Sequence, residues 1–183
     1  SPEDAKDSVI KSMQAANTKV YRQSKTHVRY EGMGTTLTLA YFYDNKACIG
    51  HVGDSRAYLI RDRTMTKITR DHSLVQELLE NGSISQEEVD THPQKNIITR
   101  ALGAERHVEI DYYELLLKDK DIILLCTDGL TQHVDLNENI ELFYSYDSLY
   151  KITTVLGEKA LENGGTDNIT IVMAKCSCMA EKR

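Results

Sequence analysis

The feature that most constrains this fold is a succession of short β-type segments separated by tight turns. Residues 35–43 are rich in β-branched and aromatic side chains, and the apolar residues 47–52 follow after a short polar turn. Strands joined by such short turns pair in antiparallel fashion, so these two segments are expected to form a hairpin. Strands at 56–61 and 65–68 would complete a meander, and further strands are predicted at 108–117, 122–127 and 169–174.

Helical periodicity appears in separate parts of the chain. It predicts helices over 4–25, 136–143 and 149–161, and two shorter helices between 71 and 92, the second beginning at a capping box at Ser85. Because helices and antiparallel strands are segregated along the chain, we expect an α+β fold in which helices cover the faces of the sheets. At 183 residues, the chain is expected to form a single domain, residues 1–183.

Composition narrows the possible partners and location. The net charge is −6 and basic residues are scattered among acidic ones, which argues against a nucleic-acid partner. No apolar stretch is long enough to span a bilayer, so no membrane association is expected. The four cysteines, which include Cys176 and Cys178, form no C-x-x-C pair, and this pattern favours a reducing, cytoplasmic location.

Three aspartates stand at the ends of predicted core strands. Asp54 lies in a break between two apolar segments, Asp128 directly follows residues 122–127, and Asp167 precedes the last strand. Any one of them alone is most simply a turn residue, since aspartate is common in turns. Three carboxylates at the mouths of neighbouring strands would repel one another unless a cation lay among them. All-oxygen ligation favours Mg²⁺, Mn²⁺ or Ca²⁺, so the pattern predicts a divalent metal site.

Five ordered motifs carry a resemblance to a known family. EGMGTTLTLAYF, IGHVGDSRAYLIR, the stretch from ITRDHS to ITRALG, LLCTDGL and GGTDNITIVMAK together span residues 32–175. In this order they resemble bacterial metal-dependent (PPM, type 2C) protein serine/threonine phosphatases. The resemblance implies a four-layer sandwich, with two antiparallel β-sheets flanked by helices, and a flap subdomain at about 71–103.

The resemblance also implies residue roles. Asp128 and Asp167 match aspartates that bind the first metal, and Asp54 matches an aspartate that holds a third, weaker metal. Asn96 matches a flap position that can reach that third metal. The neighbouring residues expected to support these ligands are Gly129, Asn168 and Ser55.

The implied reaction is hydrolysis of phosphoserine or phosphothreonine in proteins, opposing a bacterial serine/threonine kinase. Two to three Mg²⁺ or Mn²⁺ ions would be bound, and a hydroxide that bridges two of them would attack phosphorus. The main alternative is a pseudophosphatase, which binds phosphoproteins without turnover. A same-fold phosphatase acting on anti-sigma-factor antagonists is less favoured, because no sensor domain is visible in the sequence.

The sequence departs from the family at its beginning. Complete members start with strands that carry a phosphate-binding arginine and an Asp-Gly-x-Gly-Gly motif, and neither precedes the first predicted helix. We therefore expect an N-terminally truncated catalytic domain that is inactive by itself. Its open sheet edges would allow self-association between chains.

Overall fold

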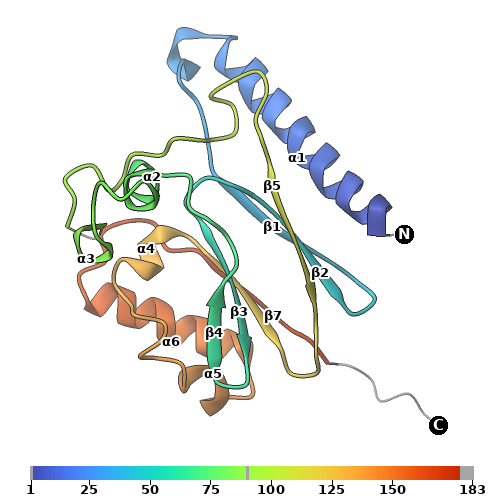
Figure 1. Ribbon diagram of the computed structural model, residues 1–183, viewed down its shortest axis with the longest axis vertical. Coiled ribbons are helices and arrows are strands. Elements are labelled where there is room, and N and C mark those ends of the chain that lie inside the picture. The colour runs from blue at the N-terminus through green and yellow to red at the C-terminus, as the bar shows by residue number, and fades with distance from the viewer. Residues whose placement is uncertain (1, 90, 178–183) are drawn as a thin grey trace.

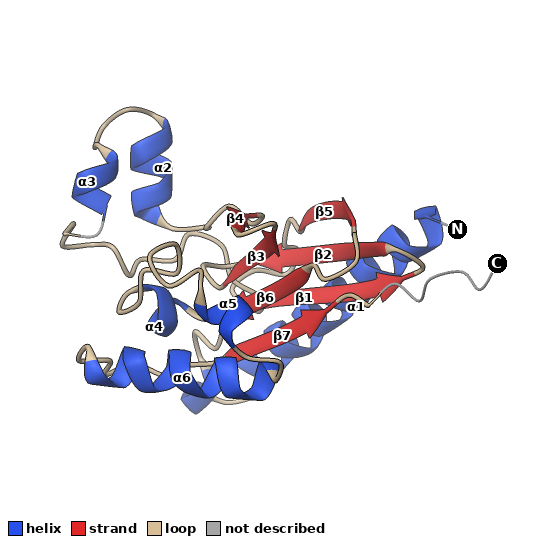
Figure 2. Cartoon of the chain, turned by 90° about the horizontal axis from the view of Figure 1, so that it is seen from below, coloured by secondary structure: helices blue, strands red, loops and turns tan. Residues whose placement is uncertain are grey.

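The computed structural model describes residues 2–89 and 91–177 and shows an α+β fold of four layers (Figures 1 and 2). Two antiparallel sheets pack against each other, with α1 covering the outer face of one sheet and α4–α6 covering the other. The helices are α1 (Pro2–Ser24), a 3₁₀ turn η1 (Val28–Tyr30), α2 (Leu74–Glu80), α3 (Gln86–Val89), α4 (Asp128–Thr131), α5 (Leu142–Ser145) and α6 (Leu149–Glu162). The strands are β1 (Leu37–Tyr43), β2 (Lys46–Val52), β3 (Arg56–Arg61), β4 (Thr64–Lys67), β5 (Asp111–Leu116), β6 (Ile122–Cys126) and β7 (Ile171–Lys175).

The first sheet has the strand order β1-β2-β5, and the second has the order β4-β3-β6-β7. Every neighbouring pair is antiparallel. The predicted hairpins β1–β2 and β3–β4 are confirmed. Asp44 in the first turn and Asp62 and Arg63 in the second have positive φ angles, a conformation that tight hairpin turns require.

The predicted four-strand meander is wrong, because β2 and β3 belong to different sheets. The chain changes sheet at Gly53, whose φ of +114° is unfavourable for other residues. It changes sheet again between β5 and β6, where Arg61 donates to Leu116 O and to both Asp121 carboxylate oxygens. Short connections therefore join the two sheets here instead of forming hairpins.

Three apolar clusters fill the spaces between the four layers. One lies between α1 and the first sheet, and it includes Val9, Met13 and Cys48. A second lies between the sheets and includes Ile49, Ala57 and Ile123. The third and largest lies under α4–α6. The central strands are buried on both faces for this reason, and their unbroken apolar runs follow from it.

Most predicted helices are confirmed, with one exception. Helices α1 and α6 match the predicted segments, and α6 ends at the Asn163-Gly164 stop. The helix predicted over 136–143 is wrong: the chain forms turns there and becomes helical only in α5. The carboxylate of Asp135 accepts hydrogen bonds from Asn137 N and Glu138 N, as an N-cap does, but the turn that it starts does not continue as a regular helix. Among the described residues, no helix is long and apolar enough to cross a membrane.

Candidate metal centre

Two of the three predicted carboxylates face the same groove. Asp54 lies in the link between β2 and β3, and Asp128 is the first residue of α4, directly after β6. Arg56 pairs with Cys126 in the antiparallel β3–β6 ladder, so the beginning of β3 and the end of β6 lie side by side. This register is what brings the Asp54 and Asp128 turns together at one end of the second sheet.

The electrostatics of Asp54 reflect this proximity. Burial, and after it the negative charge of Asp128, raises the pKa of Asp54 to about 6. The Asp128 carboxylate accepts a hydrogen bond from Gln132 Nε2 at 2.7 Å, one helical turn along the chain. A carboxylate that is costly to ionise beside a second one fits the donor set that a hard divalent cation prefers.

Asp167 lies at the same end of the second sheet but contributes differently. The β6–β7 pairing continues to Cys126 and Ile171, and Thr127 N donates to Thr170 O at 3.1 Å. The 167–168 turn thus packs against the 127–129 turn. Asp167 is exposed, and its Oδ1 accepts a hydrogen bond from the next amide, Asn168 N, at 2.7 Å.

The expected convergence of three carboxylates is therefore not seen as one compact cluster. Within residues 2–89 and 91–177, no three His, Cys, Asp or Glu side chains are close enough to hold a metal ion together. Asp54 and Asp128 fit a divalent cation as two protein ligands, and water would have to complete the coordination sphere.

The predicted supporting residues have clear structural roles. The Ser55 hydroxyl lies 3.0 Å from that of Thr36, which attaches the Asp54 turn to the chain just before β1. Gly129 is required by packing, because a Cβ atom there would lie 2.5 Å from Asn168 O. Asn96 is exposed and, among the described residues, does not line the groove, whereas its neighbour Lys95 does.

Sequence reasoning missed a charged cluster on the groove wall. Arg56 Nε and Lys67 Nζ contact the two oxygens of buried Asp71 at 2.9 and 2.7 Å, and Arg56 Nη1 donates to Thr131 Oγ1 at 3.0 Å. Burial and the Arg56 charge lower the pKa of Lys67. The side chains of Arg56 and Lys67 are thus both held by the carboxylate of Asp71. In the sequence, only Arg56 could have indicated this cluster, because it directly follows Asp54 and Ser55. Its partners Asp71 and Thr131 lie far away along the chain.

The groove has a volume of about 870 Å³ and lies between the end of the second sheet, α4 and the 71–103 segment. Helices α2 and α3 of that segment project away from the sheets (Figure 2). Both contribute to the wall, through residues such as Gln76, Glu80 and Gln86. The shape is an open polar groove that can admit an extended polar ligand.

This chain is similar to known protein phosphatases. Residues 1–103 match the family model described as Protein phosphatase 2C. The serine/threonine phosphatase stp of Listeria welshimeri is 40% identical over 173 residues, covering 94% of this chain and 69% of the relative. Protein phosphatase PhpP of Streptococcus pneumoniae is 38% identical over 161 residues, covering 88% and 65%.

Solved structures agree with these matches. Serine/threonine phosphatase Stp1 from Staphylococcus aureus superposes with a TM-score of 0.90 at 34% identity, covering 97% of this chain and 70% of that one. The catalytic domain of PstP, solved in complex with two manganese ions, gives a TM-score of 0.81 at 36% identity, covering 90% and 68%.

The four-layer fold and its acidic groove define the class of metal-dependent protein phosphatases. Both the sequence and the structural matches lead to one assignment: this chain belongs to the protein phosphatase 2C family.

Proposed function

We propose that this protein hydrolyses phosphoserine and phosphothreonine in phosphorylated proteins, with Mg²⁺ or Mn²⁺ bound at the acidic end of the groove. The observation that carries this proposal is the pair Asp54 and Asp128, which the β3–β6 register holds at one open polar groove. When bound, the metal ions supply an activated water and neutralise the charge of the phosphate.

The residues of this chain have separate roles in the proposal. By the family resemblance, Asp128 and Asp167 hold the first metal, with the Asp167 turn packed against Gly129, and Asp54 holds a further ion. Asn96 does not line the groove in this structure and would have to move toward it to reach that ion. Arg56 and Lys67 both line the groove, and Arg56 lies close enough to Asp54 to affect its pKa; the two cations share one carboxylate, Asp71, so their net charge favours an anionic substrate. Gln132 fixes the orientation of the Asp128 carboxylate through its hydrogen bond.

The test is hydrolysis of a phosphothreonine peptide by the full-length protein with added Mn²⁺. Asp128→Asn keeps the shape of the side chain but removes its charge, so turnover should fall on the order of a thousandfold, through loss of a metal ligand. Asp147→Asn is a matched control, because Asp147 is exposed and lies in the loop before α6, away from the groove residues. Equal activity of the two variants would refute the assignment. Binding of the phosphopeptide without turnover in the unmutated protein would indicate a pseudophosphatase instead.

The finer features of this function are part of the proposal. The substrates include a serine/threonine kinase and its targets, and residues 71–103 act as a flap subdomain within one catalytic domain. The buried thiols of Cys48 and Cys126 suit a reducing cytoplasm.

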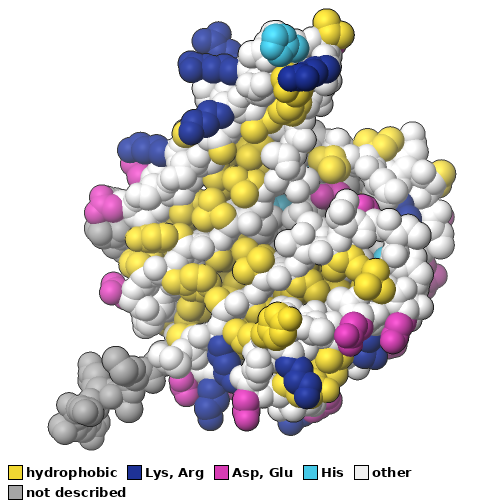
Figure 3. Space-filling view, turned by 180° about the vertical axis from the view of Figure 1, so that it is seen from behind, with side chains coloured by type: hydrophobic (Ala, Val, Ile, Leu, Met, Phe, Trp, Pro, Cys, Tyr) yellow, Lys and Arg dark blue, Asp and Glu magenta, His cyan; other side chains and the backbone are white. Residues whose placement is uncertain are grey.

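Self-association through sheet edges belongs to the same proposal. Strands β1 and β7 are terminal in their sheets, and their side chains Tyr41, Phe42 and Val172 are exposed. Hydrophobic side chains are gathered broadly on the back of the molecule (Figure 3). A row of unpaired backbone groups at such an edge can pair with a second chain. Sedimentation velocity across a concentration series would detect it.

A further inference from the structure

The flap segment is closed at its base by pairing of its two ends. Thr99 N donates to His72 O at 2.9 Å, and Leu74 N donates to Ile97 O at 2.9 Å. An isolated antiparallel bridge between Ser73 and Ile98 lies between these two bonds. The flap is thus a loop whose first and last residues form one short antiparallel ladder, and His72 is part of that ladder.

His72 also holds the turn that carries Asp54. The backbone N of His72 donates to Gly53 O at 2.7 Å, and Gly53 N donates to the ring Nδ1 of His72 at 3.0 Å. Both backbone polar groups of Gly53 are therefore bound by one residue of the flap base. Gly53 immediately precedes Asp54, so His72 restrains the backbone from which that carboxylate projects.

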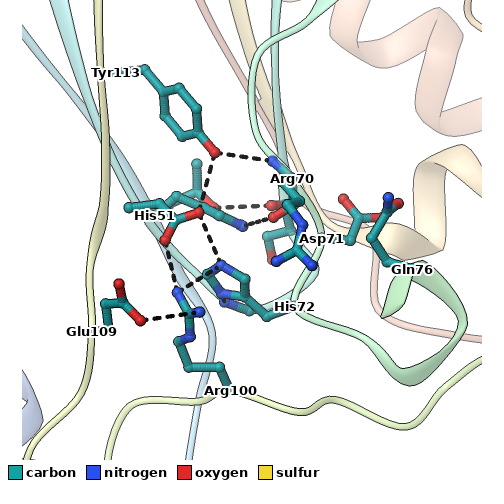
Figure 4. A network of polar contacts seen from close by, with 12 residues as sticks. His51, Arg70, Asp71, His72, Gln76, Arg100, Glu109 and Tyr113 are labelled. Carbon is teal, nitrogen blue, oxygen red and sulfur yellow. Dashed lines mark hydrogen bonds and ion pairs between the residues drawn. The ribbon is translucent and has the colours of Figure 1, made fainter. Parts of the chain in front are cut away.

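The other ring nitrogen connects His72 to β5 and to the far end of the flap. His72 Nε2 lies 3.1 Å from Asp111 Oδ2, and Arg100 donates to Asp111 Oδ1 at 2.7 Å. Figure 4 shows His72 and Arg100 side by side in this network. Because Nδ1 accepts from Gly53, the neutral ring has its hydrogen on Nε2, which donates a hydrogen bond to Asp111. Arg100 Nη1 lies 3.0 Å from the same nitrogen, which then cannot accept from it, so Arg100 donates to Asp111 instead. Arg100 directly follows Thr99, so Asp111 fixes both ends of the flap.

The ring of His72 has little freedom to move. Its side chain is 1% exposed, and it packs against the ring of His51 with 4.8 Å between centroids. His51 is held in turn by Arg70 O at 3.0 Å and by Thr38 Oγ1 at 2.9 Å. A buried, fully bonded ring transmits displacement from one side to the other, because neither side can move without breaking a hydrogen bond.

We propose that His72 is a positioning residue that couples the flap to the Asp54 turn, so that movement of the flap changes the geometry of the auxiliary metal ligand. The predicted effect on metal binding at Asp54 rests on the proposed function. The coupling itself is a property of the hydrogen-bonded network, and it can be measured without metal or substrate.

Two substitutions separate the two sides of the ring. His72→Asn places an acceptor close to the position of Nδ1 and removes the contact with Asp111. His72→Gln places its amide close to the position of Nε2 and removes the acceptor for Gly53 N. His27→Gln is the matched control, since His27 is exposed and its side chain makes no capping hydrogen bond to the 3₁₀ turn η1.

The measurement is residue-resolved amide hydrogen exchange of the full-length protein. Coupling predicts that His72→Gln accelerates exchange at Gly53 and also at Leu74 and Thr99, by about tenfold. His72→Asn should accelerate exchange at Leu74 and Thr99 and also at Gly53, although it retains the acceptor for Gly53. The amide of Leu124 in the core strand β6 should be unchanged in both variants, as should all these amides in His27→Gln.

Three results would overturn the proposal. The first is faster amide exchange on one side of the ring alone: at Gly53 only in His72→Gln, or at Leu74 and Thr99 only in His72→Asn. The second is equal acceleration at Leu124, which would show loss of global stability rather than coupling. The third is no change in either variant.

Titration of Mn²⁺ by calorimetry then tests the consequence at the metal: weaker binding at an auxiliary site is expected in His72→Gln and not in His27→Gln. A protein that shows the exchange coupling but hydrolyses no phosphopeptide would contradict the proposed function and leave the coupling intact.

Discussion

At the scale of single residues, Asp54 and Asp128 lie in one groove but differ in their expected contribution. Asp54→Ala should leave the tight metal sites in place, because the family resemblance assigns Asp54 to an auxiliary ion. Turnover should nevertheless fall on the order of a hundredfold, since one ligand-held charge near the phosphate is lost. Calorimetry with Mn²⁺ and a phosphopeptide assay measure the two effects separately. Loss of the tight sites in this variant would contradict the division of roles.

His51 gives a prediction about stability and pH. Its side chain is fully buried, and burial, together with the neighbouring His72, lowers its pKa to about 4. Below its ordinary pKa of about 6.5, the unfolded chain binds a proton that the folded chain does not bind until about pH 4. The free energy of unfolding therefore falls as the pH drops through this window. This group has almost no effect above pH 7.

The comparison that isolates this effect is urea denaturation of the unmutated protein and of His51→Asn at pH 7 and pH 5. The unmutated protein should lose about 2 kcal/mol more stability between these two pH values than the variant loses. The raised pKa of Asp54 acts in the opposite direction in both proteins, so it cancels in the difference. Equal losses in the two proteins would show that His51 does not carry this pH dependence.

At the scale of elements, the contact between the α4 turn and the turn before β7 depends on Gly129. In Gly129→Ala the new Cβ would lie 2.5 Å from Asn168 O, so the two turns must separate. Stability and phosphatase activity should both fall, because this contact holds the Asp128 and Asp167 turns together. Gly157→Ala is the matched control: nothing lies within 4 Å of its added Cβ in α6, and alanine favours the helix by about 0.5–1 kcal/mol. Thermal unfolding should shift in opposite directions in the two variants.

The helices of the 71–103 segment should open more readily than the other helices. Helix α3 buries none of its side chains and α2 buries only Val75, whereas α6 buries Ile152, Leu156 and Ala160. Few buried apolar contacts give a low free energy of local opening. Amide exchange in α3 should therefore be faster than in the middle of α6. Similar protection of both helices would contradict a mobile flap.

At the scale of the whole molecule, the apolar cluster between the two sheets should contribute strongly to stability. Ile49 is completely buried in β2 at this interface, so Ile49→Ala should lower the free energy of unfolding by about 2–5 kcal/mol. Val172→Ala is the control, because Val172 is 54% exposed on β7 and should change stability by about 0.5 kcal/mol or less. Urea titration measures both variants. A similar midpoint for the two variants would show that packing between the sheets contributes little to stability.

The local structure of this protein follows from short-range features of its sequence. The hairpins β1–β2 and β3–β4, the helices α1 and α6 and the stop at Asn163-Gly164 all follow from side-chain periodicity and turn chemistry within a few residues. The positions of Asp54 and Asp128 at strand ends were visible for the same reason. The ordered motifs added the family, and with it the four layers that periodicity alone does not give.

How these elements pack against one another depends on contacts between distant parts of the chain, which the folded structure reveals. It placed β2 and β3 in different sheets, and it joined His72 to Asp111, which lies 39 residues further along the chain. It also paired Arg56 with Asp71 on the groove wall. The physical reason is that many segments of similar sequence could form the backbone hydrogen bonds of a strand edge, and many oppositely charged residues could pair with a buried charge. Which partner is chosen depends on how all the layers pack at once, and that information is not local to any segment.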